Sequence, residues 1–227
     1  MAHRENTMRT LSSTGEIRWP PLPAVSKIET MSVPSFAEKP TLPGQHVLLR
    51  PVTPADAPAL VASLADPEVR RLTGTHHGLE PGKELEQARH WYATRADHTD
   101  RLDLAIVERD SGDCVGEAVL TDLDVDNLSC SFRIALAGSH LFGRGYGTEA
   151  TRLLLTHAFD TVGLHRVELE VFAFNPRARR VYEKVGFVWE GTKRHALWWD
   201  GEWIDLHLMG LLADEWRAHR GYPERTR

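Results

Sequence analysis

Three alternating glycines in one short loop constrain this chain of 227 residues more than any other feature. Gly143, Gly145 and Gly147 lie between a strand-like segment that ends near Leu136 and an amphipathic segment that begins near Glu149. A loop that leads into a helix N-terminus presents unpaired backbone amides and the positive end of the helix dipole. Glycine also lets the backbone approach an anion closely, because it has no side chain. The loop therefore indicates a phosphate site, although a glycine-rich turn without a ligand has the same pattern.

Two common phosphate-binding loops are excluded by the sequence of residues 142–149. A nucleoside triphosphate loop ends in Gly-Lys-Ser/Thr, which is missing here. A dinucleotide loop has the spacing Gly-x-Gly-x-x-Gly and follows a parallel strand. The glycines of this chain alternate evenly and follow segments that read as an antiparallel meander, Leu102–Val107, Val115–Leu120 and Ser131–Leu136.

The remaining pattern predicts an α+β protein, with strands and helices mixed along the chain. A short strand at Val47–Leu49 precedes three helical segments, which begin near Thr53, Asp66 and Glu84, the last extending to Ala96. After the glycine loop come a helix, a strand over Leu164–Val171 and a helix from Asn175-Pro176 to Gly186. A hairpin closes the chain, with strands Phe187–Trp199 and Trp203–Leu212 around Asp200-Gly201.

Composition limits the surroundings and the partners of the protein. The chain has 27 Lys and Arg against 32 Asp and Glu, a formal net charge of -5, so it lacks a general basic field for nucleic acid or an anionic membrane. Only two cysteines occur, and no apolar signal or membrane segment is visible. We expect a cytoplasmic protein with a disordered or draped tail over residues 1–41, one domain over 42–216 and a short tail over 217–227.

Several motifs in this order resemble the GCN5-related N-acetyltransferases (GNAT), in the branch of the Rim-type ribosomal-protein alanine acetyltransferases. They are the glycine loop with its helix, Leu164–Val167, the helix start at Asn175-Pro176, Tyr182–Phe187 and the closing strand pair. The resemblance covers residues 42–216. It implies a GNAT fold, in which helices flank a mixed, mostly antiparallel sheet of about six or seven strands that splays to hold acetyl-CoA.

The resemblance also implies where acetyl-CoA binds. The family's loop, Gln/Arg-x-x-Gly-x-Gly/Ala, corresponds to residues 142–147, with Phe142 as a departure at the first position. Backbone amides of the loop would hold the pyrophosphate, namely those of Gly143, Arg144, Gly145, Tyr146, Gly147 and Thr148. A strand edge would pair with the pantetheine arm at Ile134, Ala135 and Leu136, and Asn175 would contact that arm. An arginine would reach the nucleotide phosphates, the candidates being Arg144, Arg179 and Arg180.

Acetyl transfer to an amine needs a polarised thioester carbonyl, a neutral amine and a proton for the departing thiolate. The resemblance places Tyr182 at the position of the general acid and a backbone amide near Ala135 or Leu136 as the donor to the carbonyl oxygen. Glu117 is the first candidate for a base that acts through water, followed by Glu168 and Glu170. Each of these carboxylates also reads as an ordinary surface residue.

No metal site is expected. His76 and His77 are adjacent on a loop, where neighbouring side chains rarely face one ligand together, and no third ligand is indicated. We therefore expect an N-acetyltransferase, a monomer or a homodimer, that transfers the acetyl group of acetyl-CoA to a primary amine by direct attack in a ternary complex. The acceptor would be a protein N-terminus or a small molecule. The alternative is a non-catalytic acyl-CoA-binding or regulatory module with the same fold.

Overall fold

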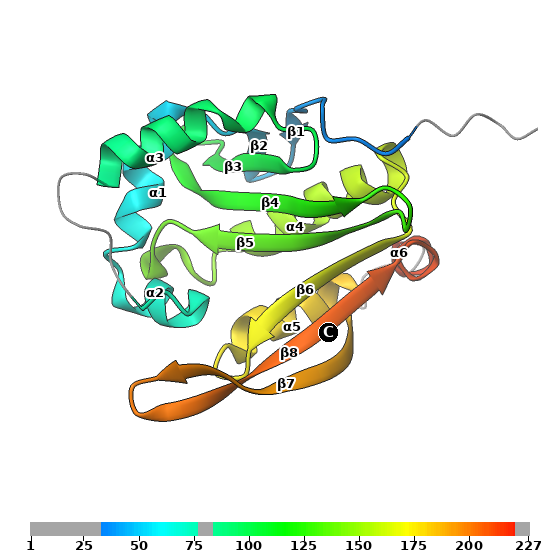
Figure 1. The fold of residues 1–227 in the computed structure, drawn as a ribbon. Coiled ribbons are helices and arrows are strands. Elements are labelled where there is room, and N and C mark those ends of the chain that lie inside the picture. The colour runs from blue at the N-terminus through cyan, green and yellow to red at the C-terminus, as the bar shows by residue number, and fades with distance from the viewer. Residues whose placement is uncertain (1–32, 77–83, 221–227) are drawn as a thin grey trace, which may run out of the picture. The chain divides into compact units, whose positions relative to one another are not determined.

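The computed structural model describes residues 33–76 and 84–220 of the chain (Figure 1). Contacts divide the chain into two units, residues 1–33 and 34–227, and all elements given below belong to the second unit. His77, residues 1–32 of the predicted N-terminal tail and residues 221–227 of the predicted C-terminal tail lie outside the described residues.

An eight-stranded sheet forms the centre of the second unit, in the order β1-β2-β3-β4-β5-β6-β8-β7 (Figure 1). All neighbouring strands are antiparallel except β5 and β6, which are parallel. The strands are Leu42–Pro43 (β1), Val47–Pro51 (β2), Leu102–Glu108 (β3), Cys114–Asp124 (β4), Ser129–Leu136 (β5), Arg166–Phe172 (β6), Val188–Trp199 (β7) and Glu202–Leu212 (β8). The predicted α+β class is confirmed. The sheet has one strand more than the six or seven expected. The additional strand is β1, which could not be predicted because it has only two residues and no alternating pattern.

Helices connect the strands. The α-helices are Ala57–Ser63 (α1), Pro67–Thr73 (α2), Glu84–Ala93 (α3), Tyr146–Thr156 (α4), Pro176–Val185 (α5) and Ala213–Arg220 (α6). Shorter helical turns are Pro54–Asp56 (η1), Arg95–Asp97 (η2), Ser139–Leu141 (η3) and the π-helical His157–Thr161 (η4). As predicted, the side chain of Asn175 caps α5 and Gly186 ends it in a left-handed conformation. None of the helices in the described part of the chain is long and apolar enough to span a membrane.

Alternate residues of β3 face two hydrophobic clusters on opposite sides of the sheet. Leu104 and Ile106 belong to the larger cluster, which includes residues of α4 and α5. Ala105 and Val107 belong to a smaller cluster with Leu60 of α1. Figure 1 shows α1 and α3 in front of the sheet and α4 behind it. Both faces of β3 are therefore buried over residues 104–107, which explains the apolar run Leu-Ala-Ile-Val at these positions.

Ordered structure extends beyond the predicted domain of residues 42–216 at both ends. Phe36 is fully buried in the main core, and its amide donates to the carbonyl oxygen of Thr99 at 2.9 Å. At the other end, α6 continues to Arg220. A single buried aromatic between prolines shows no periodicity, which is why the sequence pattern places Phe36 in a tail.

Strands β5 and β6 part after three residue pairs, and this separation creates the main opening of the sheet. Their parallel register joins Ser129 to Arg166, Cys130 to Val167 and Ser131 to Glu168, and goes no further. Beyond this point β5 continues to Leu136 along β4, and β6 continues along β8. Two strand edges therefore face each other without pairing, and Figure 1 shows the strands diverging.

Asp66 joins α2 to the segment that precedes the glycine loop. Its Oδ1 accepts hydrogen bonds from the amides of Glu68 at 2.9 Å and Val69 at 3.2 Å, which caps α2. Its Oδ2 accepts from the amide of Ser139 at 2.7 Å. These hydrogen bonds, the one from Ser139 first, lower the pKa of Asp66 to about 2. One carboxylate thus fixes two segments that border the opening.

We expect Asp66→Ala to lower the free energy of unfolding by about 1 kcal/mol, because α2 loses its cap. Asp66→Asn keeps an acceptor oxygen and should lose less than half of this. Urea unfolding of the wild type and both variants at pH 7 measures the difference. Because the pKa is lowered in the folded state, the contribution of Asp66 is present above about pH 4 and is lost as the pH falls towards 2. A deficit of Asp66→Ala that is equally large at pH 2 would contradict this assignment.

Candidate active site

A cavity of about 1020 Å³ lies between the separated ends of β5 and β6. The glycine loop and residues of α2, α4, α5 and β8 complete its lining. Both faces of the sheet contribute, because Phe132 and Leu169 are buried towards α4 and α5, whereas Arg133 and Glu170 are exposed and alternate with them along the strands. The volume is at the upper end of the roughly 300–1,000 Å³ of ligand pockets, which suits an elongated ligand.

The glycine loop has the geometry of an anion site. Gly143 and Gly145 have φ angles of 78° and 88°, which favour glycine. The first hydrogen bond of α4 joins the amide of Glu149 to the carbonyl oxygen of Gly145 at 3.1 Å. No described residue accepts a hydrogen bond from the amides of residues 143–148. A Cβ atom at Gly143, Gly145 or Gly147 would meet nothing within 4 Å, so the space beside these Cα atoms is open.

Contacts with distant segments fix the shape of this loop. The carboxylate of Glu149 accepts from the amide of Gln45 and, at 3.0 Å, from that of His46. The hydroxyl of Tyr146 donates to the carboxylate of Glu108 at the end of β3. The carboxylates of Glu149 and Glu108 therefore accept hydrogen bonds from protein groups other than the free amides of the loop. The loop amides therefore stay available for another acceptor.

The free edge of β5 presents a defined set of backbone groups to the cavity. Ala137 donates to the carbonyl oxygen of Val115 on β4 at 2.8 Å. Because backbone groups of successive strand residues point to opposite edges, the amide of Ala135 also points to β4, and those of Ile134 and Leu136 point into the opening. All three predicted residues line the cavity, but only Ile134 and Leu136 direct an amide into it.

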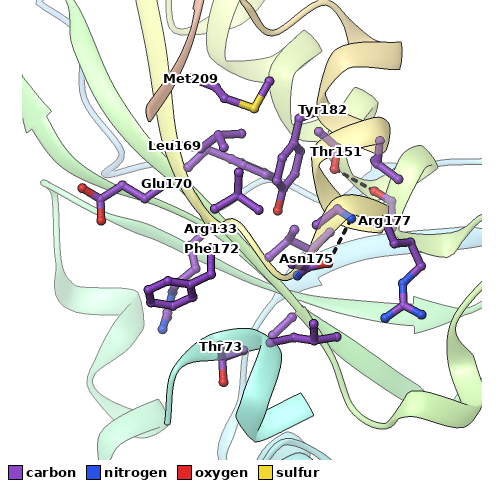
Figure 2. A pocket seen from close by; sticks show the side chains of 18 of the residues that line it. Thr73, Arg133, Thr151, Leu169, Glu170, Phe172, Asn175, Arg177, Tyr182 and Met209 are labelled. Atoms are coloured by element: carbon purple, nitrogen blue, oxygen red, sulfur yellow. Dashed lines mark hydrogen bonds between the residues drawn. The ribbon is translucent and has the colours of Figure 1, made fainter. Parts of the chain in front are cut away.

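Tyr182 contributes a hydroxyl to the middle of the cavity. The residue is 7% exposed, and its ring packs edge-on against Phe132 and Phe187 at centroid distances of 6.2 and 6.0 Å. Figure 2 shows the hydroxyl pointing into the cavity, and no described residue hydrogen-bonds to it. Burial raises the pKa of Tyr182 to about 12. The hydroxyl is thus a fixed donor that stays protonated at physiological pH.

The start of α5 adds an amide and a guanidinium to the lining. The Oδ1 atom of Asn175 accepts from the amide of Ala178 at 3.1 Å, which orients the side chain at the cavity (Figure 2). Arg177 also lines the cavity, and its guanidinium carbon lies 3.8 Å from the centroid of the Phe142 ring. Arg177 was not among the arginines predicted from the sequence. Its position directly after a helix start inside a predicted site was the available signal.

The other predicted cations do not line the cavity. Arg144 is exposed and interacts with Tyr146 beside Glu108. Arg180 is exposed and outside the lining, and Arg179 pairs with Glu183 at 2.8 Å. A helix turns by about 100° per residue, so neighbouring arginines of α5 face different directions.

The predicted carboxylates fall into two groups. Glu168 and Glu170 line the cavity, but Glu117 does not. The carboxylate of Glu117 accepts from the Tyr92 hydroxyl at 3.2 Å and pairs with Arg133 at 3.2 Å. Arg133 itself lines the cavity, so Glu117 contacts the lining through this ion pair.

His76 is the described member of the adjacent histidine pair. His76 stacks on Trp199 with ring centroids 5.1 Å apart. Across residues 33–76 and 84–220 there is no group of three or more His, Cys, Asp or Glu side chains that could hold a metal ion.

Two relatives and one solved structure illustrate what the chain is similar to. It is 33% identical over 109 residues to the "Putative ribosomal N-acetyltransferase YdaF" of Bacillus subtilis, covering 48% of this chain and 59% of that protein. It is 28% identical over 111 residues to the spermidine N(1)-acetyltransferase of Vibrio cholerae, covering 49% and 64%. The chain therefore spans less than two thirds of either relative.

The crystal structure of the Vibrio cholerae spermidine N-acetyltransferase in complex with CoA and spermine has the same fold. Its TM-score is 0.67 at 21% sequence identity, and the match covers 77% of this chain and 99% of that one. The family described as acetyltransferase (GNAT) domain matches residues 46–188, more than half of the sequence. The chain belongs to the GNAT acetyltransferase family.

Proposed function

We propose that the protein transfers the acetyl group of acetyl-CoA to a primary amine. One observation carries the proposal: a single cavity joins the free amides of the glycine loop, the free edge of β5 and the hydroxyl of Tyr182. The GNAT family uses acetyl-CoA, and the structural relative from Vibrio cholerae is titled as a complex with CoA. These features support an enzyme over a module that only binds acyl-CoA, because no described residue hydrogen-bonds to the Tyr182 hydroxyl.

Acetyl-CoA would bind along the α4–α5 side of the opening. The amides of residues 143–148 and the dipole of α4 favour the pyrophosphate, because both present positive charge to an anion. The edge of β5 at Ile134 and Leu136 would hydrogen-bond to the pantetheine arm as an added strand does. Asn175 would contact the same arm.

The chain's own groups account for the chemistry of transfer. The amide of Ile134 or Leu136 donates to the thioester carbonyl oxygen and stabilises the charge that develops there. The hydroxyl of Tyr182 donates to the departing sulfur. Holding the amine and the thioester in one cavity supplies a further part of the rate, because the attack becomes effectively unimolecular.

The acceptor would enter from the opposite face of the sheet. Thr73 and Thr75 line the cavity from the α2 region, and Arg133, Glu170 and Phe172 line it from β5 and β6 (Figure 2). Glu170 is paired with Lys193 at 2.5 Å, so this face is polar and largely charge-balanced. We propose Glu168 and Glu170, which line the cavity, as the carboxylates to test before Glu117.

A panel of amines tests the function directly. Release of the CoA thiol is measured with polyamines, peptides with free N-termini and aminoglycosides at saturating acetyl-CoA. We expect turnover with at least one class. Tight acetyl-CoA binding without turnover on any amine would favour the non-catalytic module.

A bulky side chain at the glycine loop should obstruct cofactor binding, because the loop lines the cavity. Gly147 has an ordinary helical φ and open space around it, so Gly147→Leu should fold and weaken acetyl-CoA binding by about 100-fold or more, since a close charge-assisted contact is lost. Gly191→Leu is the matched control, because Gly191 is also unstrained and its nearest neighbour lies 4.0 Å away. Calorimetric titration measures both. Equal affinities would refute the loop assignment.

Removing the Tyr182 hydroxyl should affect chemistry more than binding. Tyr182→Phe keeps the aromatic packing and should lower kcat by about 100-fold, with the Kd for acetyl-CoA changed by less than about threefold. Since the pKa of Tyr182 is about 12, the wild-type kcat should not fall between pH 7 and 10 through loss of this proton. Steady-state kinetics across this pH range tests both statements. A wild-type kcat in Tyr182→Phe would rule out the proton-donor role.

A further inference from the structure

Cationic side chains in the cavity lining differ in whether a carboxylate neutralises them. Three form ion pairs: Arg133 with Glu117 at 3.2 Å, Arg166 with Glu168 at 3.0 Å and Glu190 at 2.6 Å, and Lys193 with Glu170 at 2.5 Å. Arg177 also lines the cavity, and no described residue forms an ion pair or hydrogen bond with its guanidinium. It is the one lining cation of the described residues whose charge is left for a ligand.

Phe142 fixes the place of this charge. The guanidinium carbon of Arg177 lies 3.8 Å from the centroid of the Phe142 ring, and Phe142 directly precedes the glycine loop. A cation–π contact at this distance uses the face of the guanidinium plane. The N–H donors lie in that plane and stay free to form the paired hydrogen bonds that suit phosphate oxygens.

The location matches the anionic part of a nucleotide ligand. Arg177 lies on the α4–α5 side, where the amides of residues 143–148 have no acceptor. Figure 2 shows it beside Asn175, on the other side of the view from Glu170 and Arg133. The unpaired guanidinium and the unpaired amides therefore contribute positive potential to one end of the cavity.

We propose that Arg177, held over Phe142, binds the phosphates of the CoA nucleotide and so selects a nucleotide-bearing thiol over free pantetheine. This inference rests on the proposed function and names a binding residue for it. It assigns to Arg177 the phosphate contact that the family resemblance suggested for Arg144, Arg179 or Arg180. Phe142 is a positioning residue, because it acts through the guanidinium.

The test measures binding of CoA, dephospho-CoA and pantetheine to the wild type and to Arg177→Ala by calorimetry. We expect Arg177→Ala to weaken CoA binding about tenfold or more, the loss expected for a hydrogen bond to a charged group. Pantetheine carries no phosphate, so its affinity should not change. Lys184→Ala is the matched control, because it removes an exposed charge of α5 outside the cavity lining. Its CoA affinity should equal that of the wild type.

Dephospho-CoA distinguishes the two sources of phosphate. If Arg177→Ala also weakens binding of dephospho-CoA, Arg177 contacts the pyrophosphate. If it weakens binding of CoA but not of dephospho-CoA, Arg177 contacts the 3′-phosphate. Both results support the proposal. Phe142→Leu keeps an apolar side chain but removes the ring face, and should weaken CoA binding about threefold without affecting pantetheine. This second variant keeps the proposal testable if Arg177→Ala unfolds.

Two results would overturn the inference. One is unchanged CoA affinity in Arg177→Ala when the wild type binds CoA, which leaves the proposed function intact. The other is an equal loss for CoA and pantetheine, which would show a general structural effect. Failure of the proposed function has a different sign. In that case the wild type releases no CoA thiol with any amine, whereas the binding measurements above keep their outcome.

Discussion

The separation of β5 from β6 is the constraint on which the rest of the structure depends. An unpaired strand edge inside a protein exposes backbone groups that need partners. Here each strand keeps its other neighbour along its length, β4 for β5 and β8 for β6, so the opening costs only one row of hydrogen bonds per strand. Three residue pairs from Ser129 to Ser131 still join the two parts of the sheet. The fold thereby holds a cavity with fixed walls.

The two sides of the opening differ in whether their charged and polar groups have partners within the protein. On the face with Arg133 and Glu170, ion pairs within the protein neutralise most charged groups. On the α4–α5 side, loop amides and Arg177 have no acceptor within the described residues. An anionic ligand is therefore favoured at one end, even though the chain as a whole has a formal net charge of -5. In the proposed site, local donors and not net charge would decide where the anion binds.

Many residues of the predicted site line one cavity, but the sequence did not indicate every side chain of that lining. Local rules predicted the glycine loop before a helix, the Asn175 cap before proline and the inward face of Tyr182. The roles of Asn175 and Tyr182 towards acetyl-CoA came from the family resemblance, and both residues line the cavity. Glu117 was chosen as a base from its strand position, yet it pairs with Arg133 and lies outside the lining. Arg177 was overlooked because its role depends on Phe142, which lies 35 residues earlier in the chain.

The sequence by itself determined the order of strands and helices, the α+β class and the loop that presents backbone amides, because these depend on periodicity, caps and glycine conformations within a few residues. Tertiary structure decided which strand edges separate, which amides of β5 point into the gap and which arginine lacks a carboxylate partner. It also placed Phe36 in the core. These features depend on contacts between segments that are distant in the chain, and local sequence patterns do not predict such contacts.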